Sequence, residues 1–234
     1  MKNLAKLAGI ITLVAVIGFA MTACGNDGGD GDNPSAYLGA TLEISGEQVY
    51  TRNEAEKLIT VDGDLAIANT NGGTGAIAKG KLTYTFGTPT GGLENISEAE
   101  FFEYQWDDLK IEPSDGKWLF LEGLEITDSA DYNVVNREDD SGDELVMYTY
   151  VDKDVKITGK GKTYSEAGDY DGEYEYGKKT ENINLSLKKG WNAVHYKYSL
   201  KGDTYTESMS LRNPKNFKWV LYNYDDDDYD DEDD

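Results

Sequence analysis

Residues 182–200 read NINLSLKKGWNAVHYKYSL, and this stretch predicts the class of fold. Over residues 182–187, apolar and polar side chains alternate strictly, which is the period-two pattern of a half-buried β-strand. A second strand pattern covers residues 191–200. The three residues between the strands, KKG at 188–190, predict a hairpin turn in which Gly190 supplies a positive φ.

Other parts of the chain show the same pattern of short strands. In residues 79–86 (KGKLTYTF), Leu82, Tyr84 and Phe86 share one face, and polar residues occupy the other. Gly, Asn and Asp separate such stretches, which favours an antiparallel all-β domain built from sequential hairpins. We expect one β-sandwich over residues 36–224, with a partly open β-barrel as the alternative. Further strands are predicted at residues 109–112, 117–126, 144–151, 155–158 and 217–224.

One short stretch predicts a helix within this β-rich domain. Ser97 and Glu100 match a capping box, in which the serine caps the helix and the glutamate reaches back to it. Phe101 and Phe102 would then pack inward. We therefore expect one short helix over residues 97–105, after which the chain becomes extended again.

The start of the chain has the layout of a lipoprotein signal peptide. Lys2 and Lys6 precede an uncharged apolar run over residues 7–20, and small residues then lead to Cys24. The run is short for a membrane span, which needs about 20 apolar residues. The ending resembles a bacterial lipobox, so we expect residues 1–23 to be a signal peptide and Cys24 to receive lipid. The alternative is an ordinary signal peptide with an incidental cysteine.

Two further segments are expected to be solvated. Residues 24–35 are small, polar and acidic after the cysteine, and we interpret them as a flexible, lipid-anchored linker. Residue 25 is Gly rather than the Asp that retains enteric lipoproteins at the inner membrane, which favours the outer membrane or the cell surface of the bacterial envelope. Residues 225–234 (DDDDYDDEDD) hold nine carboxylates and predict a disordered acidic tail. This tail would bind divalent cations weakly, or would be a solubilising extension without a partner.

Charge and cysteine content argue against several classes of function. The chain has 22 basic and 45 acidic residues and a net charge of −23. Such a surface repels phosphate backbones and anionic headgroups, so we expect no nucleic-acid binding and a membrane link through the lipid alone. Cys24 is the only cysteine, and lipidation would leave no thiol for a disulfide, a metal site or a nucleophile.

His195 is the only histidine of the chain. On the strand predicted at 191–200 it falls on the same face as Lys197, and we expect that face to be exposed. A zinc site needs three or four His, Cys or carboxylate ligands, and a Ser-His-Asp set needs a serine and a carboxylate beside the histidine. We therefore expect no metal, no cofactor and no catalytic residue.

Glu122, Glu125 and Asp128 form the best carboxylate cluster in the sequence. A glycosidase needs only two carboxyl groups, about 5 Å or about 6.5–9.5 Å apart. Residues on one face of a strand are separated by even numbers, and the spacing of three does not meet this condition. We interpret the cluster as acids at a strand end and turn, and we keep a two-carboxylate polysaccharide hydrolase as the alternative function.

Aromatic residues offer a second candidate site. The chain has 17 tyrosines and 6 phenylalanines, and tyrosine suits partly exposed positions because its ring is apolar and its tip is polar. A flat platform for sugar rings could include Trp118, Trp191, Tyr196 and Tyr198. Against this, tyrosine is a strong strand former and packs well across neighbouring strands, which is the simpler interpretation.

Four phrases resemble small cell-envelope lipoproteins of oral and gut anaerobes, a group with no assigned activity. This resemblance implies a secreted, lipid-anchored, β-rich protein with a Gly-Trp-Asn turn, and it carries over no functional residues. The phrases are GEQVYT at 46–51, GGTGAI at 72–77 leading into GKL, YVDKDVKITG at 150–159 and LKKGWN at 187–192.

Together these observations favour a lipid-anchored envelope protein with a non-enzymatic binding, display or structural role. Recognition and adhesion take place at the envelope, and tyrosine-rich strands with acidic loops offer the amphipathic area that binding surfaces use. The partner classes that we expect are glycan and protein.

Replacing Cys24 tests the anchor. Cys24→Ala removes the only acceptor for lipid, so the variant should move from the membrane fraction to the soluble fraction. Partition between detergent and aqueous phases measures this. Equal partition of the variant and the parent into detergent would show that no lipid is attached at Cys24.

Overall fold

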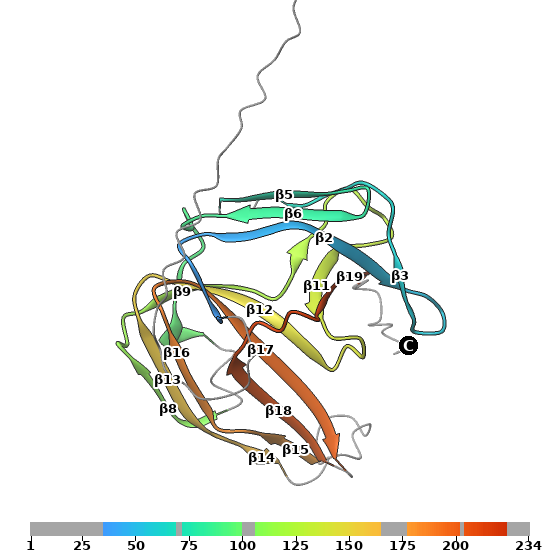
Figure 1. The fold of residues 1–234 in the computed structure, drawn as a ribbon. Helices are drawn as coiled ribbons and strands as arrows, with labels where there is room; N and C mark the ends of the chain where they lie inside the picture. Colours follow the sequence, from blue (N-terminus) through green and yellow to red (C-terminus); the bar gives the residue numbers. More distant parts are fainter. Residues whose placement is uncertain (1–34, 69–71, 100–105, 165–176, 202–203, 224–234) are drawn as a thin grey trace, which may run out of the picture. The chain divides into compact units, whose positions relative to one another are not determined.

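Figure 1 shows the fold of the chain in a computed structural model. The structure describes residues 35–68, 72–99, 106–164, 177–201 and 204–223, and all of them belong to one compact unit, Asp32–Asp234. The predicted signal peptide, Cys24, the linker up to residue 34 and the acidic tail lie outside the described residues.

The described residues form nineteen strands and one 3-10 turn. The strands are β1 (Tyr37–Gly39), β2 (Leu42–Arg52), β3 (Leu58–Thr60), β4 (Leu65–Ala66), β5 (Gly73–Ala78), β6 (Lys81–Phe86), β7 (Glu94–Asn95), β8 (Trp106–Glu112), β9 (Lys117–Leu121), β10 (Leu124–Glu125), β11 (Val134–Glu138), β12 (Glu144–Val151), β13 (Val155–Gly161), β14 (Thr163–Tyr164), β15 (Gly177–Thr180), β16 (Ile183–Leu187), β17 (Gly190–Lys201), β18 (Thr204–Leu211) and β19 (Lys218–Tyr222).

These strands make two sheets, and the predicted all-β, antiparallel sandwich is confirmed. The large sheet has 16 strands, and its main path runs β14-β15-β18-β17-β12-β11-β19-β2-β6-β5-β4. The small sheet has the order β16-β13-β8. Only the pairs β15–β18 and β19–β2 are parallel among the described strands. The main path has two open ends in the part that the structure describes, so the sandwich describes the fold and a closed barrel does not.

Strands β12 and β17 lie at the centre because both of their faces are buried. Tyr148 and Trp191 pack on one side with residues of β2, β5, β6 and β19, in what we call the β6 core. Met147 and Val194 pack on the other side with residues of β8, β13 and β16, in what we call the β13 core. The large sheet curls so that β12 and β17 form a middle layer between the β2–β6–β5 layer and the small sheet (Figure 1).

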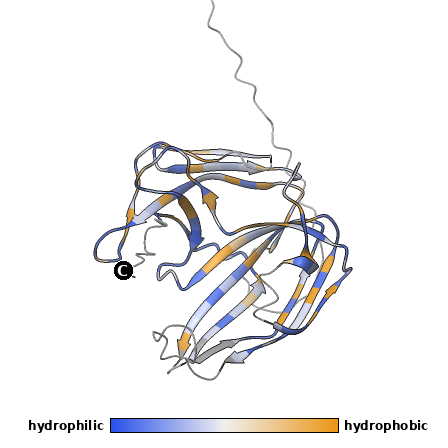
Figure 2. Ribbon diagram, turned by 180° about the vertical axis from the view of Figure 1, so that it is seen from behind, coloured by the Kyte–Doolittle hydropathy of each residue, from blue (hydrophilic) through white to orange (hydrophobic). Residues whose placement is uncertain are grey.

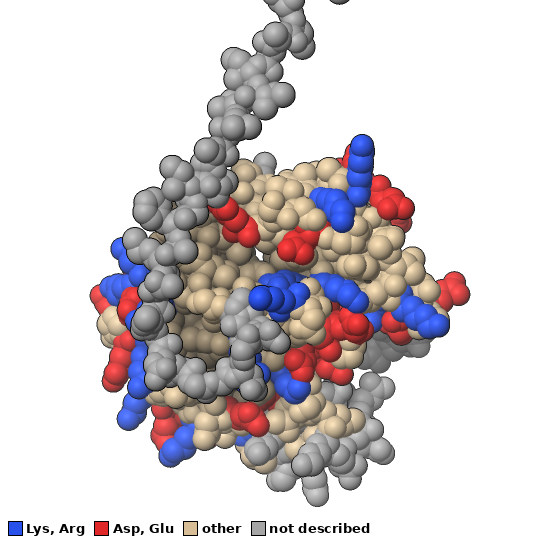
Figure 3. All heavy atoms as spheres, in the orientation of Figure 1, with Lys and Arg blue, Asp and Glu red and all other residues tan. Residues whose placement is uncertain are grey.

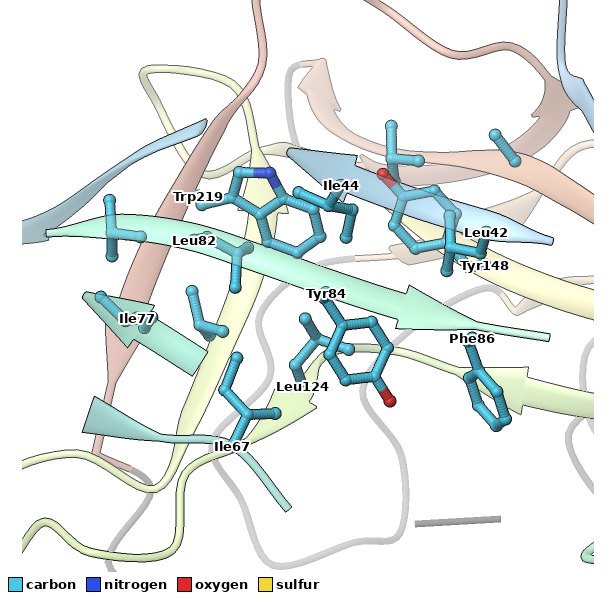
Figure 4. Packing of buried hydrophobic residues seen from close by; sticks show 14 of the residues in the cluster. Leu42, Ile44, Ile67, Ile77, Leu82, Tyr84, Phe86, Leu124, Tyr148 and Trp219 are labelled. Atoms are coloured by element: carbon cyan, nitrogen blue, oxygen red, sulfur yellow. The ribbon is translucent and has the colours of Figure 1, made fainter. Parts of the chain in front are cut away.

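Strand β6 shows how alternation builds one of these cores. Leu82, Tyr84 and Phe86 are almost fully buried, as the period-two pattern predicts, and Figure 4 shows them on the core side of their strand. Phe86 packs against Trp191 with ring centroids 4.7 Å apart. Burying one such side chain stabilises a fold by roughly 1.5–3 kcal/mol, so this face of β6 is a major contribution.

The hairpin predicted over residues 182–200 is wrong, although both strands exist. Strand β16 pairs with β13 in the small sheet, whereas β17 pairs with β12 and β18 in the large one. The turn at 188–190 therefore carries the chain from one sheet to the other. The Asn192 side chain holds this turn, since its Oδ1 accepts from the Lys188 N–H (3.0 Å) and its Nδ2 donates to the carbonyl oxygens of Lys188 (2.8 Å) and Gly190 (3.0 Å). Gly190 has φ +111°, the positive value that was predicted.

Sequential hairpins account for only part of the large sheet. Neighbours in the chain do pair at β5–β6, β11–β12 and β17–β18. By contrast, β12 pairs with β9 and β17, and β19 pairs with β11 and β2. These long-range pairings place strands that are distant in the chain side by side in the large sheet.

The helix predicted over residues 97–105 is also corrected. A single 3-10 turn covers Ile96–Glu98, and Asn95 rather than Ser97 precedes it. The chain is extended again at Ala99 (φ −73°, ψ 111°), so no α-helix starts there. Phe101 and Phe102, which were expected to pack inward, lie outside the described residues. The turn exists because Ile96 is buried in the β13 core and its N–H donates to the Gly116 carbonyl (3.0 Å).

A buried ionic network joins three strands of the large sheet. Arg52 Nη2 donates to Glu138 Oε1 (2.7 Å), and the Tyr222 hydroxyl donates to the same carboxylate (2.6 Å to Oε1). Burial raises the pKa of Tyr222 to about 12, and the bond to Glu138 acts in the same direction. Burial alone would lower the pKa of Arg52, but hydrogen bonds to Glu138 and Tyr222 outweigh it and raise the pKa. Arg52 thus neutralises a carboxylate that is nearly inaccessible to water.

Removing one partner of this network should destabilise the fold strongly. Arg52→Met leaves the Glu138 charge buried without its cation, and we expect the free energy of unfolding to fall by about 3 kcal/mol in urea titrations. Adding Glu138→Leu should restore much of the loss, because two apolar partners leave no uncompensated charge. Lys188→Met, which breaks the exposed pair with Asp154, is the control and should change little. An equal loss in the control would mean that burial of the pair is unimportant.

Candidate functional site

The outer surface of the small sheet carries the candidate site. On β13, Val155 and Ile157 are buried in the β13 core, so Lys156, Thr158 and Lys160 point the opposite way. The same alternation on β8 and β16 adds further polar groups, and Figure 2 shows apolar and polar residues alternating along these strands. A depression of about 700 Å³ lies on this surface. We call this surface the polar face. Its depression is lined by Asp108, Leu109, Lys110, Lys156, Thr158, Gly159, Lys160, Asn182, Ile183 and Asn184.

A β-bulge shapes the middle of the polar face. Between β8 and β13 the register shifts, so that Lys110 lies opposite Thr158 but Asp107 lies opposite Lys160. Asp108 falls in the bulge with φ +49°, and its Oδ2 accepts a hydrogen bond from Lys160 Nζ at 2.8 Å. Bulges often redirect a side chain in this way. The hydrogen bond and charge of Lys160 lower the pKa of Asp108, and Asp108 raises the pKa of Lys160 in return.

Two other lysines on the polar face are not paired in this way. Neither Lys110 nor Lys156 forms an ion pair with a carboxylate in the part of the chain that the structure describes. Lys156 lies opposite Ser186 on one side and opposite Glu112 on the other. Figure 3 shows basic and acidic side chains interspersed along the side where β8 and β13 lie. The face therefore presents two ammonium groups in a chain whose net charge is −23.

Amide and hydroxyl groups complete the lining. Thr158 and Asn184 are opposite each other in the register of β13 and β16. Asn182 sits at the edge, where its Oδ1 accepts from the Gly161 N–H (3.1 Å) and so holds the side chain in place. Side chains on strands over a packed core keep their positions well, which favours specific hydrogen bonding to a ligand.

The structure does not form the aromatic platform that the sequence offered as a second candidate site. Trp118, Trp191 and Tyr196 are all buried, and Trp191 is fully so. Its indole N–H donates to the Gly87 carbonyl (2.9 Å). Tyr196 and Tyr198 meet edge to face, at an interplanar angle of 66°, so they do not make a flat surface. The physical reason is that β17 belongs to the middle layer, where aromatic rings fill both cores.

The carboxylates considered for hydrolysis serve the fold in part. Asp128 Oδ1 accepts a hydrogen bond from the Ala66 N–H (2.7 Å) and so joins the turn after β10 to strand β4. Glu125 lies on β10, Glu122 lies in the turn before it, and both are exposed. Their positions agree with acids at a strand end and turn.

His195 is buried rather than exposed, contrary to the expectation from alternation. It is 6% accessible, because it lies on β17 between β12 and β18, and Phe217 packs edge to face against its ring at 5.6 Å. Its Nε2 lies 2.9 Å from Glu144 Oε2, and its Nδ1 lies 3.5 Å from Ser210 Oγ. Glu144 also forms a very short contact with Lys197.

The protonation of this network follows from its surroundings. Burial lowers the pKa of His195 below its usual value, although the hydrogen bond to Glu144 opposes the shift. A neutral ring fits the geometry when Nε2–H donates to Glu144 and Nδ1 accepts from Ser210. Burial acts to raise the pKa of Glu144, but bonds from Lys197 and His195 outweigh it and lower the pKa. Serine, histidine and glutamate are the groups of a hydrolytic set, yet the 3.5 Å separation is at the limit of a hydrogen bond, and we interpret the network as structural.

The alternation of polar residues in the sequence contains a signal for the polar face. Residues 156, 158 and 160, like 182, 184 and 186, are the polar positions of strictly alternating strands. The two strands that bear them are distant in the chain, and only their pairing in one sheet brings the lysines and amides together.

Comparisons with known proteins found no relative of this chain. No protein-family model matches the chain, and neither the curated proteins nor the solved structures contain a match. Among the described residues, no helix is long and apolar enough to cross a membrane. Within the same residues, His, Cys, Asp and Glu side chains form no group of three or more that could hold a metal ion.

The buried histidine predicts a pH dependence of stability. With its folded pKa lowered, the unfolded chain takes up a proton near pH 6.5 before the folded chain does, so stability should fall as the pH decreases from about 7 to 5. Below about pH 4.5 the lowered pKa of Glu144 should add a further loss. Urea unfolding at several pH values measures both. Since no other histidine exists, His195→Gln should abolish the change between pH 7 and 5, and an unchanged slope would contradict this.

Proposed function

We propose that the protein is a lipid-anchored component of the bacterial cell envelope with a non-enzymatic binding role, and that a glycan binds at its polar face. The envelope location rests on the sequence of residues 1–24, with the lipid on Cys24. The binding role rests on the polar face, which is the observation that carries the proposal.

The composition of the polar face suits a sugar ligand. Sugar hydroxyls both donate and accept hydrogen bonds, and Thr158, Asn182 and Asn184 offer groups of both kinds. Lys110 and Lys156 add donors that no described carboxylate engages in an ion pair. The strands that bear these groups lie on a packed core, so little ordering is needed when a ligand binds.

A protein partner fits this surface less well. Protein interfaces depend on buried Trp, Tyr and Arg side chains at their centres. The polar face has none of these among its lining residues, and Leu109 and Ile183 are its only large apolar ones. A glycan therefore suits the face better than a protein does.

The alternative, a two-carboxylate polysaccharide hydrolase, is less well supported. Such an enzyme needs two facing carboxyl groups, one of them protonated near neutral pH through a raised pKa. Asp108 is the single carboxylate among the lining residues that the structure describes, and its pKa is lowered by Lys160. This group is thus a poor general acid, which supports a binding role.

Retention and cleavage on one glycan panel separate the two functions. The full-length chain should be retained by at least one plant or host polysaccharide, without release of reducing ends. Thr158→Val with Asn184→Leu removes a hydroxyl and an amide at nearly constant shape. The loss of two hydrogen bonds, each about 0.5–1.5 kcal/mol, should weaken retention at least about fivefold.

A matched control lies on the large sheet. Thr83→Val with Thr85→Leu alters two exposed positions of β6, far from the polar face in the fold, and should leave retention unchanged. Equal weakening by both pairs would place the ligand elsewhere. Release of reducing ends that one Glu→Gln change abolishes would establish the hydrolase instead.

A further inference from the structure

We infer that the polar face takes an acidic polysaccharide, one that carries carboxylate or sulfate groups along its chain. This inference rests on the proposed glycan-binding function and names the class of ligand. It follows from where the positive charges of this acidic protein are placed and from how one of them is neutralised.

The local charge of the polar face differs from that of the whole chain. The lining of the polar face holds three lysines and one carboxylate, whereas the whole chain holds 22 basic and 45 acidic residues. The sign of the charge is therefore reversed on this surface. Glu112 borders it, opposite Lys156 in the register, but forms no ion pair with that lysine. A neutral glycan would need hydrogen-bonding groups only, and the excess of lysine is complementary to an anion.

The two lysines without an ion pair lie on neighbouring strands of the polar face. Strands β8 and β13 are neighbours, and Lys110 lies opposite Thr158, two residues along β13 from Lys156. Such diagonal positions on one face of an antiparallel pair are roughly 7–8 Å apart. The flexible side chains of two lysines at such positions allow their ammonium groups to contact one anionic group together or two groups on adjacent sugars. The amide of Asn184 lies on the other side of Thr158 and can bind the neighbouring hydroxyls.

Asp108 reduces the positive charge of the polar face. The bulge and the positive φ of Asp108 bring its carboxylate to 2.8 Å from Lys160, so this third lysine is already compensated. Asparagine tolerates the left-handed region about as well as aspartate does. Asp108→Asn should therefore keep the backbone while releasing the charge of Lys160. The variant is a test in which binding increases, and loss of folding cannot imitate that result.

The net charge of −23 disfavours broad polyanion binding. DNA and anionic membranes present dense negative charge over a wide area, which the acidic remainder of the surface repels. A polysaccharide chain is narrow and can lie within the depression alone. Single-stranded DNA is thus the appropriate comparison for an effect of charge without sugar recognition.

The experiment uses the full-length chain in detergent and measures dissociation constants by titration calorimetry. The probes are polygalacturonate, its methyl-esterified form, dextran sulfate, neutral dextran and single-stranded DNA. We expect polygalacturonate or dextran sulfate to bind at least tenfold more tightly than methyl-esterified polygalacturonate and neutral dextran. Comparing the affinities for polygalacturonate and dextran sulfate distinguishes recognition of carboxylate from recognition of sulfate. Binding should weaken as salt increases, because the charges are exposed.

Three variants locate the effect. Lys110→Gln with Lys156→Gln should weaken binding of the preferred anionic glycan at least tenfold. Lys153→Gln with Lys188→Gln removes the same charge from exposed lysines outside the polar face and should change it by less than twofold. Asp108→Asn should strengthen binding about threefold and increase its salt dependence.

The outcomes separate the inference from the function on which it rests. Equal affinity for esterified and free polygalacturonate, or unchanged binding in all three variants, would overturn the acidic ligand and leave glycan binding in place. Equal affinity for DNA would also overturn it, since sugar recognition would then be absent. Failure of every polysaccharide to bind would overturn the proposed function itself.

Discussion

The burial of β12 and β17 on both faces is the constraint on which this structure depends. The two strands pair over eight positions, from Glu144–Lys197 to Val151–Gly190. Successive side chains along them point alternately into the β6 core and the β13 core. A central strand of this kind cannot present a binding platform, because its aromatic rings fill the interior. Side chains that face solvent are therefore found on the outer layers, and the small sheet is one of these layers.

Buried polar groups give this hydrophobic framework a single arrangement. Asn192 holds the chain where it passes between sheets, and Glu138 with Arg52 and Tyr222 fastens three strands of the large sheet. His195 and Glu144 tie β17 to β12 in the same way. Each of these polar groups is satisfied only in one register, so a shifted strand would leave it unpaired at a cost of about 1–3 kcal/mol or more.

The polar face depends on the core beneath it. Val155, Ile157, Leu185 and Leu187 are almost inaccessible to water, and they hold β13 and β16 so that alternate residues point outward at regular intervals. The bulge at Asp108 then modifies this regular surface by neutralising one lysine. The core thereby determines the positions of the side chains on the polar face, and the bulge determines how many of its lysines are neutralised.

The sequence by itself determined the strands but not their partners. Alternation identified β6, β12, β16 and β17 within a residue or two, because a strand with a buried face must place apolar residues at every second position. It misplaced His195, because alternation assumes one exposed face and β17 has none. The turn at residues 188–190 looked like a hairpin for a similar reason: local patterns do not reveal which sheet receives the next strand.

Only the tertiary structure decided the candidate site. The lysines and amides of the polar face come from three strands spread over residues 106–187, and no local pattern relates residue 110 to residues 156 and 184. Pairing β8 and β16 on either side of β13 brings them together. Composition and the first 24 residues determined the expected location and the acidic surface, since both are properties of the chain before it folds. The site required the long-range pairing that burial of two cores imposes.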